Sequence, residues 1–203
     1  ISVMLDNNLG TLVAVLAPRG RDAQVASDLL RHEGINARIV ANLSQLANQI
    51  RGHLGAILIA EEACGGTDFS VLRDALREQA AWSDVPFVVL TNGMKTSRTA
   101  DEEERLDALG NVVLLARPMH RDDILRAVRS ALKARKRQFE ARERMEELQE
   151  HERQLAESQR KFHAIANSVD QMIWSTRPDG YHDYYNSRWY EFTGVPEGSN
   201  DGE

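Results

Sequence analysis

The stretch GAILIA, at residues 55–60, decides the fold class. It is short, wholly apolar and followed directly by Glu61 and Glu62, as expected of a strand that is buried on both faces of a sheet. Apolar runs of similar length lie on both sides of it along the chain, at residues 11–17 (TLVAVLA), 37–40 (ARIV), 86–91 (PFVVLT) and 111–116 (NVVLLA). Together the five runs predict five buried strands.

The segments between these runs have the spacing of amphipathic helices. We expect these helices to begin or end at residues with the appropriate capping preference, namely Asp22, Gly34, Ser44, Asp68 and Asp101. Strands that alternate with helices predict an α/β fold with a doubly wound, five-stranded parallel sheet. Ligands of such folds bind at the carboxyl ends of the strands, which here are residues 17–21, 60–64, 91–93 and 117–119.

Residues 120–167 contain no proline and no glycine, so we expect one helix several times longer than average. Two series of residues follow heptad spacing within it and predict a coiled coil that forms a parallel homodimer. Gln138, Glu152 and Gln159 make the seam partly polar. The residues assigned to the dimer helix are Ala141, Met145, Leu148, Leu155 and Phe162, and earlier seam positions fall on Ala131 and Ala134. The alternative is a solvated single helix.

The last part of the chain, MIWSTRPDGYHDYYNSRWYEFTG at residues 172–194, is rich in aromatic residues. Residues 172–176 and 181–185 read as two strands of a hairpin, joined by the tight turn Pro178-Asp179-Gly180. A small α+β unit is therefore expected after the long helix.

Composition limits the environment and the partners. The chain has 203 residues, a net charge of −6 and one cysteine, Cys64, which fits a reducing cytoplasm. No apolar run approaches the roughly 18 residues that a membrane helix needs, so we expect no membrane partner. The basic run at residues 133–137 is followed by glutamate and has no aromatic residue in its basic part; we interpret it as a solvated helix face and expect no nucleic-acid partner.

The alternation of elements, Thr91 at the end of the fourth run and Arg117-Pro118 after the fifth resemble the receiver domain of two-component response regulators over about residues 11–134. The resemblance implies a site with an acidic pair that binds Mg²⁺, an aspartate that accepts a phosphoryl group, and a lysine. Here the acidic pair falls on Ala17 and Pro18, and the acceptor falls on Ala60 or, with a shift of one residue, on Glu61. Arg117 stands in the lysine position and Thr91 keeps its hydroxyl.

We therefore interpret this part as a pseudo-receiver that has lost phosphotransfer, with no catalytic residue, metal or cofactor. Glu61, Glu62 and Asp68 could instead gather a cation, or Glu61 could imitate a phosphorylated aspartate beside Arg117 and Thr91. A solvated acidic loop is favoured over metal binding, and an ion pair of Glu61 with Arg117 is the intermediate interpretation. Cys64 is expected to be an inert thiol, because no base is placed near it by sequence.

The aromatic segment resembles the opening of a PAS domain. The resemblance is carried by Ile173-Trp174, by the turn at residues 177–180, and by Asn186, Arg188-Trp189 and Thr193-Gly194. It is especially similar to PAS domains that precede the HWE-type histidine kinases of alphaproteobacteria. Only about the first 40 residues of such a domain are present, so the resemblance implies no ligand.

These patterns predict a receiver-like domain at residues 10–130, a coiled-coil signalling helix at 131–161 and the start of a truncated PAS domain at 162–203. The predicted function is a non-catalytic input region of a cytoplasmic sensor histidine kinase, with a signalling protein as partner. Two alternatives remain open. One is a phosphorylatable response regulator that uses Glu61 or Asp68, and the other is a dimeric adaptor for protein interactions.

Overall fold

The computed structural model describes residues 10–18, 21–50, 54–65, 68–93 and 98–197. Residues 19 and 20 of the first predicted site loop, and residues 198–203 of the predicted PAS segment, lie outside the described residues. The chain divides into two compact units, Ile1–Glu143 and Arg144–Glu203. Each unit is described below by itself.

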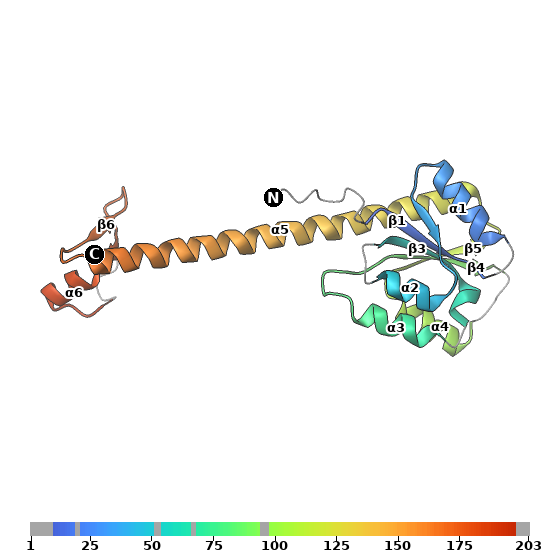
Figure 1. The fold of residues 1–203 in the computed structure, drawn as a ribbon, viewed down its shortest axis with the longest axis horizontal. Helices are drawn as coiled ribbons and strands as arrows, with labels where there is room; N and C mark the ends of the chain where they lie inside the picture. Colours follow the sequence, from blue (N-terminus) through green and yellow to red (C-terminus); the bar gives the residue numbers. More distant parts are fainter. Residues whose placement is uncertain (1–9, 19–20, 51–53, 66–67, 94–97, 198–203) are drawn as a thin grey trace. The chain divides into compact units, whose positions relative to one another are not determined.

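A parallel sheet of five strands forms the centre of the first unit (Figure 1). Its strands lie in the order β2-β1-β3-β4-β5, with the bounds β1 Leu12–Leu16, β2 Ala37–Ile39, β3 Leu54–Ala60, β4 Phe87–Asn92 and β5 Val112–Arg117. Every residue of β3 is buried, which explains why its sequence is apolar without alternation. The predicted doubly wound α/β fold is confirmed, and its strand order is that of flavodoxin-like sheets.

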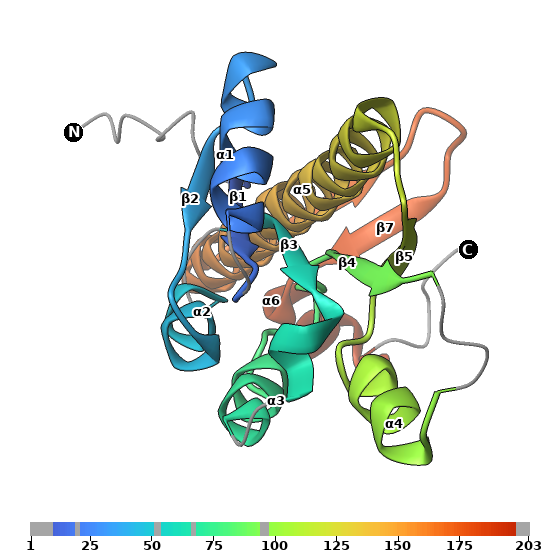
Figure 2. The same ribbon diagram turned by 90° about the vertical axis from the view of Figure 1, so that its right-hand side faces the viewer.

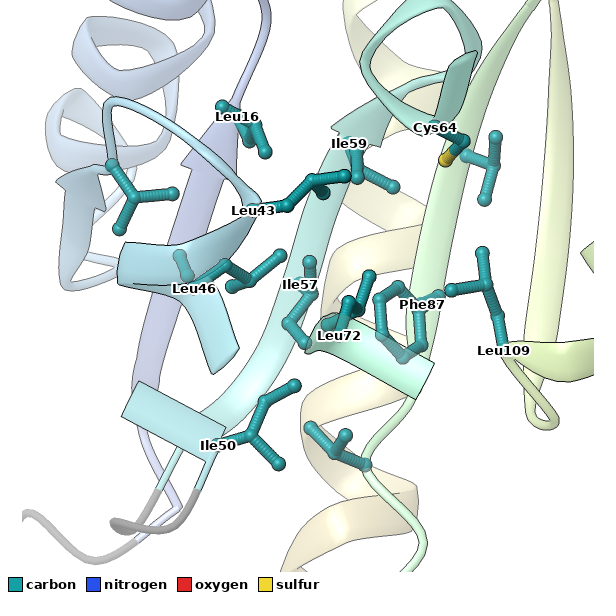
Figure 3. Packing of buried hydrophobic residues seen from close by; sticks show 14 of the residues in the cluster. Leu16, Leu43, Leu46, Ile50, Ile57, Ile59, Cys64, Leu72, Phe87 and Leu109 are labelled. Atoms are coloured by element: carbon teal, nitrogen blue, oxygen red, sulfur yellow. The ribbon is translucent and has the colours of Figure 1, made fainter. Parts of the chain in front are cut away.

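Helices cover both faces of this sheet, as Figure 2 shows. Side chains of α1 (Asp22–His32) and of the first turns of α5 (Arg121–Ser168) pack on one face. The other face carries α2 (Leu43–Ile50), α3 (Phe69–Arg77) and Leu109, which follows α4 (Ala100–Ala108). Figure 3 shows the second cluster, in which Leu46, Ile57, Leu72 and Phe87 interdigitate. Burial of these two apolar layers is the main stabilising term of the unit.

The ends of the helices agree only partly with prediction. Gly34 ends α1 with a left-handed φ of 74°, as expected. Asp68 occupies the N-cap position of α3 as predicted, but its side chain accepts no capping hydrogen bond. The prediction that Asp22 caps α1 is wrong, because Asp22 is the first helical residue and Arg21 occupies the cap position. The carboxylate of Asp22 instead accepts a hydrogen bond from Arg117. Helix α4 begins one residue before Asp101, behind a capping box of Thr99 and Glu102.

The long helix α5 spans Arg121–Ser168, within one residue of the predicted bounds. Leu125, Val128 and Ala131 bury its first turns against the sheet. In the basic run Lys133, Lys136 and Arg137 are exposed as predicted. Arg135 contradicts the prediction of a solvated face, because it is buried against the domain. Among the described residues, no helix is long and apolar enough to cross a membrane.

A loop of 3-10 helix, η1 (Glu61–Gly65), follows β3 directly and was not predicted. It turns the chain sharply at the carboxyl end of the central strand. Because a 3-10 helix has three residues per turn, consecutive residues of η1 point in different directions. The side chains of Glu61 and Glu62 therefore point toward different neighbours.

The second unit contains the predicted hairpin, with β6 (Trp174–Thr176) antiparallel to β7 (His182–Tyr185), followed by α6 (Ser187–Thr193). Asn186 lies fully buried at its centre. Its Nδ2 donates to the carbonyl oxygens of Ala166 at 2.8 Å and Gln171 at 2.9 Å, and its Oδ1 accepts from the amides of Ile173 and Trp189. One side chain thus joins the end of α5 to the hairpin and caps α6.

We predict that Asn186→Ala lowers the stability of the second unit by about 2–4 kcal/mol, because several buried backbone groups lose their partner. The matched control is Asn167→Ala, which removes one exposed hydrogen bond to the amide of Ser187 and should cost less than about 1 kcal/mol. Hydrogen exchange of the β6, β7 and α6 amides measures both. Equal effects of the two substitutions would contradict the central role of Asn186.

Candidate functional site

The carboxyl edge of the sheet brings the predicted site residues together. Ala17 and Pro18 follow β1, and Ala60 is the last residue of β3. Thr91 pairs with Ala116, one position before Arg117 ends β5. Because β1, β3, β4 and β5 are adjacent and parallel, their carboxyl ends meet at this edge. Alanine and proline side chains offer neither a carboxylate ligand for a divalent ion nor a nucleophile for a phosphoryl group.

Glu61 forms an ion pair at this edge, but not with the residue that the sequence indicated. Its Oε1 lies 2.9 Å from Nε of Arg98, just before α4. Glu61 is only 9% exposed, so the pair is screened from water on the carboxylate side. The prediction that Glu61 pairs with Arg117 is therefore wrong. Because η1 begins at Glu61, this side chain turns toward the loop after β4 and away from β5.

Arg117 holds two other carboxylates. Its Nη1 donates to Glu62 at 3.1 Å, and its Nη2 donates to Asp22 at 3.2 Å. The planar guanidinium suits this bridging role, since its nitrogen atoms diverge toward separate acceptors. The bridge links the beginning of α1, the loop after β3 and the end of β5. The positive charge in the lysine position is thus already engaged by acidic groups of the same chain.

Thr91 is buried, and its Oγ1 donates to the carbonyl oxygen of Leu115 at 3.4 Å. A bond of this length is weak. It nevertheless directs the hydroxyl toward the neighbouring strand β5. The Arg117-Pro118 peptide bond that follows β5 is cis.

A small pocket of about 120 Å³ lies between η1 and α4. Its lining residues are Glu61, Glu62, Cys64, Gly65, Asn92, Glu102, Arg105 and Leu106. Arg105 donates to the carbonyl oxygen of Cys64 at 3.2 Å across it. Burial, aided by the charge of Glu61, raises the pKa of Cys64 to about 12. The thiol is therefore protonated at neutral pH, which agrees with the expectation of an inert cysteine.

The carboxylates of this edge do not converge on one point. Glu61 pairs with Arg98, whereas Glu62 and Asp22 pair with Arg117. In the part of the chain that the structure describes, no group of three or more histidine, cysteine, aspartate or glutamate side chains is arranged to hold a metal ion. A cation at this edge would have to compete with the guanidinium groups that already neutralise the carboxylates.

Sequence reasoning missed Arg98, Asp22 and Arg105 as members of the site. Arg98 lies six residues beyond the end of β4, outside the strand ends that the sequence singled out, and Asp22 was assigned to a helix cap. The available signal was charge complementarity, because Glu61 and Glu62 follow β3 and two arginines, Arg98 and Arg117, lie after or at the ends of the next two strands. Such a signal identifies the group but not the individual pairs.

Known structures resemble this chain, although neither protein-family models nor curated protein sequences match it. The chemotaxis protein CheY4 of Vibrio cholerae is 19% identical with a TM-score of 0.47, and the match covers 60% of this chain and 98% of CheY4. NtrX from Brucella abortus is 14% identical with a TM-score of 0.51, covering 65% of this chain and 28% of NtrX. A fusion that carries the trimeric coiled coil of yeast Spc42 is 16% identical with a TM-score of 0.51, and the match covers 74% of this chain and 98% of the fusion. The structural neighbours include response regulator receiver domains, and at such identities the likeness establishes the fold alone.

We predict that Arg98→Ala destabilises the first unit by about 1–3 kcal/mol, because it leaves the buried Glu61 carboxylate unpaired. The double variant Arg98→Ala with Glu61→Ala should recover part of that loss. The control Arg126→Ala removes an exposed pair with Asp123 and should have no measurable effect. Urea unfolding of the wild type, of Arg98→Ala, of Glu61→Ala and of the double variant gives the coupling free energy, and a coupling of zero would show that the pair does not fix this edge.

Proposed function

We propose that this chain is a non-catalytic input region in two-component signal transduction, and that its receiver-like domain works without accepting a phosphoryl group. The observation that carries the proposal is the composition of the carboxyl edge. Ala17, Pro18 and Ala60 occupy the positions where the resemblance implies carboxylates, and the nearby acidic side chains are paired with arginine. The kinase that such a region would regulate is a sensor histidine kinase.

The chemistry of phosphoryl transfer supports this assignment. Transfer to a carboxylate brings several negative charges together, and a divalent cation with a positively charged side chain must neutralise them. Arg117 already shares its charge between Glu62 and Asp22. An incoming phosphoryl group would therefore have to break ion pairs before it gained any.

The pair of Glu61 and Arg98 suggests how the edge is held in one state. It joins the end of β3 to the loop before α4 by a charge pair that belongs to the chain itself. Glu61 carries the negative charge that a phosphorylated aspartate would supply at this end of the sheet, although its partner is Arg98 rather than Arg117. We infer that this domain acts as a fixed adaptor for other proteins, with no dependence on phosphorylation.

The second unit supports the link to a histidine kinase. Its hairpin, the tight turn with Gly180 at a φ of 90°, and the cap formed by Asn186 fit the opening of a PAS domain. PAS segments follow signalling helices in the HWE-type kinases that the sequence resembles. The proposal therefore places this chain upstream of a kinase module.

We predict that treatment with acetyl phosphate and Mg²⁺ leaves the intact mass of the full chain unchanged. A phosphorylatable receiver domain, treated in parallel, controls for the activity of the reagent. A phosphoryl adduct on this chain would contradict the proposal and favour the phosphorylatable response regulator. Glu61→Gln and Asp68→Asn variants would then show which carboxylate accepts the group, since only one of them should lose the adduct.

A second candidate function, a homodimeric adaptor, is favoured by the exposed seam of α5. Met145, Leu148, Leu155 and Phe162 are 58%, 60%, 61% and 50% exposed. They follow heptad spacing, as does Ala141, which is also exposed. A second copy of the same helix in parallel orientation would bury this stripe, which single solvated helices rarely carry. In that orientation Glu152 faces Glu152 of the other copy, so like charges weaken one layer of the seam.

We predict that Leu148→Asp with Leu155→Asp abolishes dimerisation, because two charges enter the seam. Glu152→Leu should tighten the dimer by at least about tenfold, since it replaces a repulsive layer by an apolar one. The control Glu147→Leu lies outside the seam and should leave the affinity unchanged. Sedimentation equilibrium measures all three, and a wild-type chain that stays monomeric at every concentration would remove the dimeric candidate.

A further inference from the structure

Arg135 is buried where α5 leaves the sheet, and the described residues offer it no carboxylate as a hydrogen-bond partner. Arg135 is 1% exposed and lies within the first unit. Its Nε donates to the carbonyl oxygen of Leu54, the first residue of β3, at 3.1 Å. Its Nη1 donates to Oε1 of Gln138 at 2.6 Å. Burial lowers the pKa of Arg135, although the charge of Asp84 opposes the shift. Burying a charge in this way costs free energy unless hydrogen bonds and neighbouring groups offset the loss of solvation.

Gln138 fixes the next turn of the helix to the start of β4. Its Nε2 donates to the carbonyl oxygen of Asp84 at 2.8 Å, and its Oε1 accepts from the amide of Asp84 at 3.1 Å. One side-chain amide thus satisfies both backbone groups of a residue three positions before β4. Because Gln138 also accepts from Arg135, the two side chains form one connected network.

Aromatic rings complete the attachment. Two guanidinium groups contact the ring of Trp82, with the Cζ atoms of Arg135 and Arg142 at 5.4 Å and 4.8 Å from its centroid. The ring centroids of Phe139 and Trp82 lie 5.2 Å apart, and Cζ of Arg135 lies 4.8 Å from the centroid of the Phe139 ring. Cation–π contacts of this kind offset part of the desolvation of the arginines. We call Trp82, Arg135, Gln138, Phe139 and Arg142 the helix clamp.

Two glycines make room for the helix clamp and the adjacent turn of α5. A Cβ atom at Gly10 would lie 2.6 Å from Cε2 of Phe139, and Gly10 also has a φ of 74°. A Cβ atom at Gly55 would lie 2.6 Å from Cδ2 of Leu132 and closer still to the carbonyl oxygen of Gly10. Close approach of α5 to the sheet therefore depends on the missing side chains at both positions.

The helix clamp also limits the seam of α5. Ala131 is buried on the sheet, and Gln138 is bound to Asp84. The prediction that these two residues belong to the heptad seam is therefore wrong, because within one chain both already contact the receiver-like domain. Heptad positions become available to another helix only from Ala141 onward. Up to Arg142, this face of α5 packs on its own domain. Beyond Arg142, no described element of that domain covers it.

We propose that the helix clamp transfers the state of the receiver-like domain to α5, which rests on the proposed signalling function. Strand β3 has the Glu61–Arg98 pair at its carboxyl end and Leu54, held by Arg135, at its amino end. Strand β4 precedes the Arg98 loop, and Asp84 lies just before its amino end. A partner that binds the carboxyl edge displaces it, and these two strands carry the displacement to the clamp. There it shifts the equilibrium between a closed and an open arrangement of residues 135–142.

The test is hydrogen exchange of the full chain, read from the amides of residues 133–143. Gln138→Ala and, separately, Trp82→Leu should raise their exchange about tenfold by opening the clamp. Arg137→Ala is the matched control, since Arg137 is exposed on the same turn. Unchanged exchange in both clamp variants would overturn the proposal. If either variant fails to fold, Arg142→Gln removes one face of the Trp82 contact and serves as the weaker perturbation.

Transfer from the distant edge is tested by Arg98→Ala in the same experiment. The variant should raise exchange at residues 133–143 by more than its loss of global stability accounts for, whereas Arg126→Ala, on α5 itself, should not. A change confined to η1 and α4 would overturn the transfer. None of these readouts involves phosphorylation. A phosphoryl adduct would therefore contradict the proposed function, whereas the role of the helix clamp would still be tested by the exchange result.

Discussion

Strand β3 is buried along its whole length, and an arginine anchors the chain at each of its ends. At the carboxyl end Arg98 binds Glu61, and at the amino end Arg135 binds the carbonyl oxygen of Leu54. A strand that is packed between two helical layers cannot slide or rotate independently, because protein interiors are close-packed. The candidate site and the helix clamp therefore lie at opposite ends of one rigid element. This arrangement underlies both the proposed function and the proposed role of the helix clamp.

Arginine side chains neutralise the carboxylates at the carboxyl edge of the sheet. Arg117 bridges Glu62 and Asp22, and Arg98 neutralises Glu61. The arginines of these pairs belong to the chain itself, whereas a phosphoryl group comes and goes. Under the proposed function, the carboxyl edge keeps one electrostatic state and regulation comes from a partner that binds the domain. The domain would then be an adaptor rather than a phosphorylation switch.

Much of the fold could be predicted because buried parallel strands read as apolar runs. GAILIA became β3, and Gly34 ended α1 because only a residue tolerant of positive φ fits there. The individual partners could not be predicted. Arg98 precedes α4, Glu61 begins η1 and Arg117 ends β5, and the 3-10 turn η1 decides which charge meets which. Arg135 was taken for part of a solvated basic run because its neighbours are exposed, and burial against Trp82 and Leu54 depends on contacts far apart in sequence.

The central claim is that the carboxyl edge does not bind the groups used in phosphotransfer. Its most direct test is a titration of the full chain with Mg²⁺, with and without beryllofluoride as a phosphoryl mimic, followed by amide NMR shifts of residues 60–64 and 91–92. The account predicts no saturable shift at these amides under either condition. A saturable shift that requires both Mg²⁺ and beryllofluoride would contradict it and restore the phosphorylatable receiver.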